Sequence, residues 1–287
     1  MKVAVTGATG FIGRHVLSEL KKHPIEVIAS TRHSHDETLS TLGNNTIPLD
    51  VYSSPADAFE QLGRPDVLIH LAWGGLSNYK STDHFEVELP AQYRFLRNMI
   101  KSGLKNLFIA GTCAEYGMQS GPLDETTLAM PCNPYGFAKD CLRKQLEYFN
   151  KSVPVNLTWG RLFYLYGEGQ AEASLLPQLH NAIKNGDSTF NMSKGDQIRD
   201  FLDVSIVAKH IVNLSLYGKG LGIINICSGQ PISIRSVVEK WIRKNNWKIE
   251  LNLGHYPYPD YEPLAFWGIC EKLNNFINQN ESLNRNI

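Results

Sequence analysis

The sequence lacks several features that mark whole classes of protein. Five cysteines are scattered over 287 residues without a Cys-x-x-Cys pair, which argues against a zinc site or a disulfide framework and for reduced thiols. Basic and acidic residues number 28 each, so the formal net charge of zero favours neither nucleic acid nor an anionic membrane as a partner. No apolar run is long enough to span a bilayer, and the first residues form a strand pattern rather than a signal peptide. These absences predict a cytoplasmic globular protein without a metal.

What the sequence has is an N-terminal strand pattern that leads into a glycine-rich turn. Lys2 to Val5 are typical of a buried strand, Phe11–Leu20 are typical of a helix with one apolar face, and Gly7, Gly10 and Gly13 occupy the junction. Glycine permits a tight turn, a close approach of the backbone to a pyrophosphate, and close packing of helix on strand. The first N–H groups of the helix then favour phosphate. The placement predicts dinucleotide binding; a glycine turn that binds nothing is the alternative.

Strand and helix patterns alternate through the first half of the chain. Further strands are predicted at Glu26–Thr31, Ile47–Leu49, Asp66–Ala72, Lys105–Ala110 and Val155–Phe163, with helices near Pro55–Leu62, Phe85–Ser102 and Tyr135–Lys151. Near-continuous apolar strands are typical of a parallel sheet covered on both faces. The alternation predicts an α/β fold with a Rossmann-type doubly wound parallel sheet.

The regular alternation of strand and helix patterns ends after Gly167, which predicts a smaller C-terminal substrate lobe. Elements are predicted near Ala173–Asn185 (helix), Ser188–Asn191, Ile198–Asp203 and Gly222–Ile226 (strands) and Ile234–Asn245 (helix), before a loop at Tyr256–Glu262. We assign residues 1–165 and about 198–217 to a dinucleotide-binding domain, and about 166–197 and 218–287 to the lobe. Ligands are expected at the carboxyl ends of the parallel strands.

A tyrosine and a lysine four residues apart form the candidate chemical site. Tyr135 and Lys139 open a helix behind the turn Pro131–Pro134, and positions i and i+4 share one helix face. The unperturbed pKa of a phenol is about 10, and a neighbouring ammonium lowers it. Together with the glycine turn, the pair predicts an acid–base site; a solvated helix face is the alternative.

Seven short motifs occur in order along nearly the whole chain. They are Thr6-Gly-x-x-Gly-x-x-Gly13, Asp50-Val51, His70-Leu-Ala72, Gly111-Thr-Cys-Ala-Glu-Tyr-Gly117, Tyr135-x-x-x-Lys139, Arg161-Leu-Phe-Tyr-Leu-Tyr-Gly167 and Arg199-Asp-Phe201. In this order they resemble the extended short-chain dehydrogenases/reductases, the NAD(P)-dependent epimerase/dehydratase family, which acts mostly on nucleotide sugars. A nucleotide sugar is therefore the expected partner, and a homodimer is the expected assembly because Phe85–Ser102 and Tyr135–Lys151 resemble the family's pairing helices.

The resemblance implies roles for individual residues. Tyr135 would protonate the substrate oxygen, Lys139 would hold the nicotinamide ribose and tune the phenol, and Thr112 would hydrogen-bond the reacting carbonyl. His70 is expected to be a hydrogen-bonded core residue. The cofactor-binding set comprises Gly7, Gly10, Phe11, Ile12, Gly13, Asp50, Val51, Leu71, Ala72, Tyr135 and Lys139.

The end of the second strand bears on the choice of cofactor. NAD enzymes of this shape usually carry an acidic residue there, which grips the ribose 2′-OH. This chain has Ser30, Thr31 and Arg32 instead, and Arg14 directly follows Gly13. Because arginine suits a 2′-phosphate, Arg14, Thr31 and Arg32 join the cofactor-binding set and NADP(H) is predicted; two solvated arginines are the alternative.

The residues after Thr112 restrict the reaction. Sugar-nucleotide dehydratases of the family carry Asp-Glu there, whereas this chain has Cys113 and Ala114, which cannot act as an acid–base pair. A reductase and a 4-epimerase remain, and the predicted NADPH preference favours reduction. A non-catalytic NADP-binding regulator is a third hypothesis, which the intact Thr112, Tyr135 and Lys139 argue against.

A narrower resemblance concerns the substrate. Leu71–Tyr79, Gly111–Gly117 and Tyr261–Trp267 are similar to reductases of nucleotide-linked 4-keto-6-deoxyhexoses (dTDP-, CDP- or GDP-sugars) in deoxysugar and O-antigen biosynthesis. The substrate-binding set that follows is Trp73, Asn78, Tyr79, Thr112, Cys113, Tyr164 and Arg199, with Arg199 on the phosphates. Trp73, Asn78 and Tyr79 could line the sugar pocket or simply anchor a loop. Tyr164 replaces the family's usual asparagine.

Overall fold

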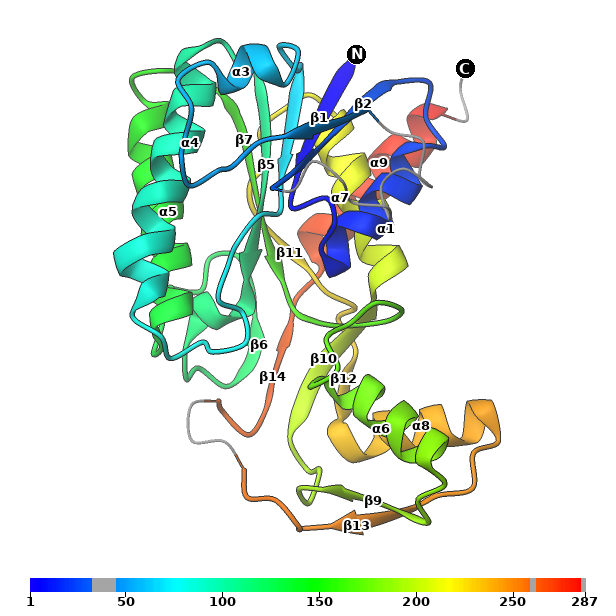
Figure 1. The fold of residues 1–287 in the computed structure, drawn as a ribbon. Helices are drawn as coiled ribbons and strands as arrows, with labels where there is room; N and C mark the ends of the chain where they lie inside the picture. The colour runs from blue at the N-terminus through cyan, green and yellow to red at the C-terminus, as the bar shows by residue number, and fades with distance from the viewer. Residues whose placement is uncertain (33–44, 259–261, 285–287) are drawn as a thin grey trace.

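A seven-stranded sheet forms the centre of the molecule in the computed structural model, which describes residues 1–32, 45–258 and 262–284 (Figure 1). The strand order is β11-β7-β5-β4-β1-β2-β3, and every neighbouring pair is parallel. The strands are β1 (Lys2–Thr6), β2 (Glu26–Thr31), β3 (Asn45–Pro48), β4 (Val67–His70), β5 (Asn106–Thr112), β7 (Asn156–Leu162) and β11 (Gly222–Ile226). Chain order reverses between β1 and β4, as in doubly wound Rossmann sheets, so the predicted fold class is confirmed.

Helices cover both faces of this sheet. In Figure 1 one face carries α1 (Phe11–Leu20), α7 (Val204–Leu216) and α9 (Glu271–Asn284), and the other carries α3 (Ala58–Gln61), α4 (Leu89–Lys101) and α5 (Pro134–Asn150). Two apolar clusters fill the layers, because the strands are apolar on both sides and each helix buries one stripe; in α1 that stripe includes Val16, Leu17 and Leu20. In the described part of the chain, no helix is both long and apolar enough to cross a membrane.

A smaller lobe lies beyond the carboxyl ends of the strands (Figure 1). It contains α6 (Leu175–Asn185) and α8 (Ile234–Asn245), the pair β9 (Thr189–Met192) and β13 (Glu250–Leu253), and a three-stranded sheet of β12 (Pro231–Ser233), β10 (Ile198–Asp203) and β8 (Tyr164–Tyr166). Its own apolar core includes Leu179, Val238 and Trp241. The pair β6 (Gly121–Leu123) and β14 (Phe266–Gly268) links the strand ends to the last part of the chain.

Two predicted boundaries differ from the observed ones in an informative way. β11 and α9, which the sequence-based division places with the lobe, lie in the seven-stranded sheet and its core cluster, where Ile224 and Phe276 are buried. The long helix predicted from Phe85 is a π-helical turn, His84–Glu88, followed by α4. Pro90 lacks the N–H group that regular helical bonding requires, so α4 begins just before it. The division into domains stays a prediction.

Candidate active site

The glycine turn after β1 is shaped by close backbone contacts. Gly7 has a φ of +69°, and a Cβ there would lie 2.7 Å from the backbone of Leu71 and Ala72, while a Cβ on Gly13 would lie 2.2 Å from the Gly7 carbonyl oxygen. A Cβ on Gly10 would meet only the Gly7 carbonyl oxygen, at 3.2 Å. Internal packing therefore excludes side chains at Gly7 and Gly13 more strongly than at Gly10. The turn fits a pyrophosphate, because no side chain caps α1 and its first N–H groups are available.

The ends of β1 and β4 meet in a buried polar relay. The hydroxyl of Thr6 lies 2.7 Å from Nδ1 of His70, and Nε2 of His70 lies 2.8 Å from Oε1 of Gln92. Gln92 donates in turn to Glu88 at 3.0 Å. Burial, assisted by the positive charge of Lys139, lowers the pKa of His70 to about 3. His70 is thus a neutral, hydrogen-bonded core residue, and that prediction is confirmed.

Lys139 projects from the first turns of α5 into the space beneath the strand ends. α5 begins at Pro134 because Asn133 caps it, accepting from the Gly136 N–H at 2.8 Å. Nζ of Lys139 donates to the Ala110 carbonyl oxygen at 2.9 Å and lies 3.9 Å from the centre of the Trp73 ring. Burial lowers the pKa of Lys139 to about 7, against the opposing effect of the carboxylates of Glu115 and Glu88.

Tyr135 lies in an aromatic cluster one helical turn before Lys139. Its ring stacks on Tyr79 with centroids 5.0 Å apart, and the rings of His84 and Trp73 lie 5.3 and 6.1 Å away. Burial raises the pKa of Tyr135 above the usual phenol value, the charge of Tyr79 adds to this, and a hydrogen bond with Thr112 opposes it. The phenol is consequently a protonated group near neutral pH, which suits a proton donor.

Thr112 ends β5 and begins the short 3₁₀ helix Cys113–Tyr116 through a capping box. Its Oγ1 accepts from the Ala114 N–H at 3.2 Å, and its own N–H donates to Oε1 of Glu115 at 2.9 Å. With an Oγ1 lone pair occupied by Ala114, the hydroxyl proton points elsewhere and is available to Tyr135 or a ligand oxygen.

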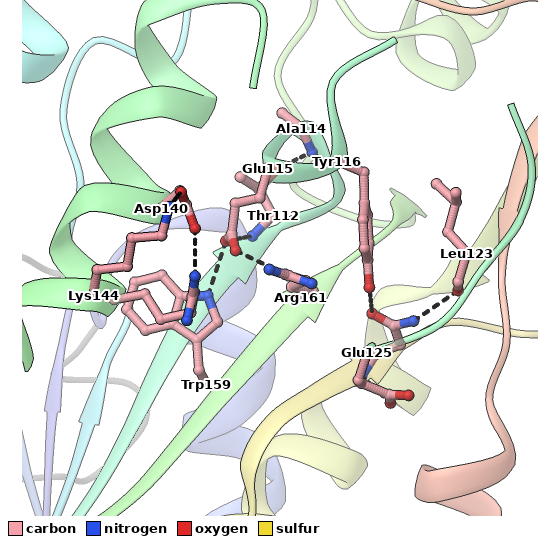
Figure 2. A network of polar contacts seen from close by, with 12 residues as sticks. Thr112, Ala114, Glu115, Tyr116, Leu123, Glu125, Asp140, Lys144, Trp159 and Arg161 are labelled. Carbon is pink, nitrogen blue, oxygen red and sulfur yellow. Dashed lines mark hydrogen bonds and ion pairs between the residues drawn. The ribbon is translucent and has the colours of Figure 1, made fainter. Parts of the chain in front are cut away.

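Glu115 is a site residue that the sequence analysis missed. Its carboxylate is completely buried and also accepts from Nε1 of Trp159 at 2.9 Å and Nε of Arg161 at 2.8 Å (Figure 2). The Arg161 guanidinium lies 4.4 Å from the centre of the Tyr116 ring, and the Tyr116 hydroxyl bonds Asn225. The Thr-x-x-Glu spacing of a capping box was the signal that could have found Glu115.

Loop residues after β4 also reach the site. Trp73 Nε1 donates to Nδ1 of His84 at 3.1 Å, so His84 Nε2 carries the proton and donates to the Asn78 carbonyl oxygen at 3.0 Å. The side chain of Asn78 accepts from the Lys80 N–H at 3.1 Å. The structure brings Trp73 and Tyr79 against Tyr135, whereas Asn78 shapes the loop; the predicted sugar contacts of all three stay predictions.

The predicted adenosine end is more open. Leu71 and Ala72 follow β4 against the glycine turn, Phe11 and Ile12 are half-buried on α1, Thr31 and Val51 are buried, and Arg32 and Asp50 are exposed. The Asp50 carboxylate accepts from the N–H groups of Tyr52 and Ser53 and so supports a turn. Arg14 donates to the Gly169 carbonyl oxygen at 3.4 Å. The NADP(H) preference stays a prediction.

Arg199 is buried in a cluster on the lobe side of the site. Its Nη2 pairs with Oε2 of Glu262 at 2.9 Å, its Nη1 donates to the Ile198 carbonyl oxygen at 2.8 Å, and its guanidinium lies 4.7 Å from the centre of the Phe266 ring. Burial and the negative charge of Glu262 raise the pKa of Tyr164. The predicted phosphate contact of Arg199 stays a prediction, since Glu262 already engages this guanidinium.

Two further observations bear on the predicted substrate contacts. Burial, with the charge of Glu262, raises the pKa of Cys113 to about 12, so its thiol is neutral. Sequence reasoning assigned no role to Glu262, although it lies in the Tyr261–Trp267 motif, whose first residue is outside the described ranges.

Comparison with known proteins gives consistent matches. The NAD dependent epimerase/dehydratase family matches residues 3–227. The chain is 33% identical over 272 residues to a dTDP-6-deoxy-L-talose 4-dehydrogenase (NAD(+)) of Aggregatibacter actinomycetemcomitans, covering 93% of this chain and 99% of that protein. It is 27% identical over 244 residues to a GDP-6-deoxy-D-talose 4-dehydrogenase of the same organism, covering 83% and 78%.

Solved structures show the same fold. A UDP-glucuronic acid 4-epimerase of Bacillus cereus, in complex with UDP-glucuronic acid and NAD, superposes with a TM-score of 0.84 at 22% identity, covering 97% of this chain and 93% of that one. MoeE5 in complex with UDP-glucuronic acid and NAD gives a TM-score of 0.80 at 24% identity, with the same coverage.

Proposed function

The chain belongs to the NAD dependent epimerase/dehydratase family, and from that premise we propose that it catalyses NADPH-dependent reduction of the C4 ketone of a nucleotide-linked 4-keto-6-deoxyhexose. The observation that carries the proposal is the grouping of three side chains: the Tyr135 phenol, whose pKa burial raises, is hydrogen-bonded with Thr112, and its ring centre lies 6.0 Å from the Lys139 ammonium. The similarity to a protein named as a 6-deoxyhexose 4-dehydrogenase supports chemistry at C4.

Thr112, Tyr135 and Lys139 have separate roles in the proposed proton transfer. When bound, the reduced nicotinamide supplies the hydride for C4. Thr112 donates a hydrogen bond to the ketone oxygen, and Tyr135 gives that oxygen its proton, so the ketone becomes an alcohol and Tyr135 a phenolate. Lys139, in its protonated form, stabilises the phenolate and binds the ribose hydroxyls. Trp73 and Tyr79 pack against this group and exclude water from it.

The cofactor proposal is NADPH rather than NADH. Arg32 is exposed directly after β2, positions 30–32 carry no acidic side chain that would repel a 2′-phosphate, and Arg14 lies beside the glycine turn. Replacing Arg32 with Ala should raise KM for NADPH about tenfold or more and leave KM for NADH unchanged. Arg94→Ala, an exposed arginine on α4, is the matched control. A wild-type protein that prefers NADH, as the name of the talose relative suggests, would contradict the proposal.

The reaction is tested with purified protein and candidate 4-keto-6-deoxy nucleotide sugars. Stoichiometric loss of NADPH absorbance with formation of the 4-hydroxy sugar supports reduction. Interconversion of two sugars without net cofactor loss would establish the competing 4-epimerase, and cofactor binding without any turnover would establish a regulator. Arg199, Tyr164, Cys113 and Trp73 are the proposed substrate contacts.

We also propose that the protein is a homodimer paired through α4 and α5. On α5, Phe137 and Tyr148 expose 47% and 72% of their surface, which is unusual for large apolar residues. A Tyr148→Lys variant should shift the molar mass measured by light scattering to that of one chain; a wild-type monomer would contradict the proposal.

A further inference from the structure

Glu115 joins two strands of the central sheet, β5 and β7, at the candidate active site. Its carboxylate accepts from the backbone N–H of Thr112 at the end of β5, and from Trp159 and Arg161 on β7 (Figure 2). The side chains of Glu115 and Arg161 are 0% and 1% exposed. A buried carboxylate with a charged partner and three N–H donors is held in one orientation.

The contacts of Glu115 govern the geometry of Thr112. Glu115 holds the Thr112 N–H, and the turn that follows brings the Ala114 N–H to the Thr112 hydroxyl at 3.2 Å. This second bond occupies a lone pair of the hydroxyl and leaves its proton free to donate. The direction of that proton therefore depends on the capping box, in which Glu115 supplies half of the hydrogen bonds.

Only a carboxylate satisfies all three donors at once. Oε1 serves Thr112 and Trp159 while Oε2 serves Arg161. A glutamine has one acceptor oxygen, so it would leave either Arg161 or the other two donors without a partner. Without the carboxylate at position 115 the Arg161 guanidinium would lose its ion pair, and its buried Nη1 already has no acceptor among the described residues.

We propose that Glu115 is a positioning residue that directs the Thr112 hydroxyl toward the substrate oxygen. This inference rests on one part of the proposed function: the protein must catalyse some conversion at C4, whether reduction or epimerisation. Glu115 touches no reacting atom, and its effect on the rate passes through Thr112.

Kinetics of Glu115→Gln test the inference. We expect kcat to fall about 100-fold, as for other small misplacements of a reacting group, while KM for the cofactor changes less than about threefold. Trp159→Phe is the matched control, because it removes a donor to the same oxygen and leaves the Thr112 contact and the ion pair intact. Equal kcat values in Glu115→Gln and Trp159→Phe would overturn the proposal.

A double-mutant cycle shows whether the effect passes through Thr112. In a Thr112→Ala background the hydroxyl is absent, so adding Glu115→Gln should lower kcat no further. If Glu115→Gln slows the Thr112→Ala variant by the same factor as the wild type, the proposal is wrong.

Rescue supplies a variant that separates positioning from folding. In the Glu115→Gln/Arg161→Gln variant, the amide oxygen at position 161 stands where Nε of Arg161 stood in the wild type. It accepts a hydrogen bond from the amide N–H of position 115. The amide oxygen of position 115 then remains as the acceptor for Thr112 and Trp159. We expect kcat within about tenfold of wild type; a folded double variant as slow as about 100-fold overturns the inference. The assay follows whichever C4 conversion the wild type catalyses, so an absence of ketone reduction counts against the proposed function alone.

Discussion

The protonation state of Lys139 should limit the pH range of the reaction. Burial lowers its pKa to about 7, and a neutral amine cannot stabilise the phenolate that forms on Tyr135. We expect kcat/KM for the cofactor, which reports the free enzyme, to be level below pH 7 and to fall tenfold per unit above it, reaching about 100-fold at pH 9. Ionisation of Tyr135 does not add a further fall in kcat/KM between pH 7 and pH 9, because burial raises the pKa of this phenol.

Replacing Glu88 tests whether the fall in kcat/KM above pH 7, the alkaline limb of the pH profile, arises from Lys139. Glu88 is 6% exposed, and its carboxylate accepts from Gln92 at 3.0 Å and from the Tyr52 hydroxyl and raises the pKa of Lys139. Glu88→Gln withdraws that favourable charge and should move the limb to lower pH. The other groups that act electrostatically on or with Lys139 are Glu115, which this variant leaves in place, and His70, which is neutral at these pH values.

Initial rates measured at constant ionic strength from about pH 6 to pH 9 cover the expected limb. Glu86→Gln is the control, because Glu86 is exposed on the same π-helical turn and should leave the limb in place. A profile that is level up to pH 9, or a limb that Glu88→Gln leaves unmoved or shifts upward, would refute the assignment to Lys139.

Four other predictions follow from the same geometry. Tyr135→Phe should lower kcat about 1,000-fold while cofactor affinity measured by calorimetry stays within a few-fold; retained turnover would remove Tyr135 from its role. Burial lowers the pKa of Lys139 from 10.5 to about 7, so the folded state carries a penalty of roughly 5 kcal/mol when this group is protonated. Lys139→Met should therefore unfold at a higher temperature than wild type at pH 6, with the gap closing as pH rises toward 10; a less stable variant at pH 6 would contradict this. Gly13→Ala should destabilise the fold by about 2 kcal/mol or more, because its Cβ meets the Gly7 carbonyl oxygen at 2.2 Å. Gly10→Ala should unfold at nearly the wild-type temperature but bind cofactor at least about tenfold more weakly, and full affinity would show that the turn does not hold the diphosphate.

The central sheet was predictable because local pattern carries its information. Short apolar strands alternating with amphipathic helices specify a parallel sheet, and Phe11–Leu20, Glu26–Thr31 and Gly222–Ile226 were predicted with the observed bounds. The partner of a strand is different. Gly222–Ile226 pairs with β7, far back in the chain, and nothing in a five-residue apolar run identifies that partner.

The candidate site was predictable to the extent that its residues lie in local motifs. Tyr135 and Lys139 share a helix face by spacing alone, and the structure brings the Tyr135 phenol to Thr112 and the Lys139 ammonium 6.0 Å from the centre of the Tyr135 ring. Glu88 and Glu262 acquire their importance only through tertiary contacts, Glu88 near Lys139 and Glu262 against Arg199. A sequence read alone shows such carboxylates as ordinary polar residues, because burial and pairing are properties of the fold.

The pairing of β11 with β7 has a consequence for synthesis on the ribosome. β7 is complete at Leu162, yet the strand that covers its outer edge begins only at Gly222. At about 5–20 residues per second, the roughly 60 intervening residues take several seconds to emerge. During that interval the nascent chain presents an apolar, unpaired strand edge, the feature that templates association between chains. Slow codons or a chaperone acting on this stretch would therefore influence the yield of folded protein.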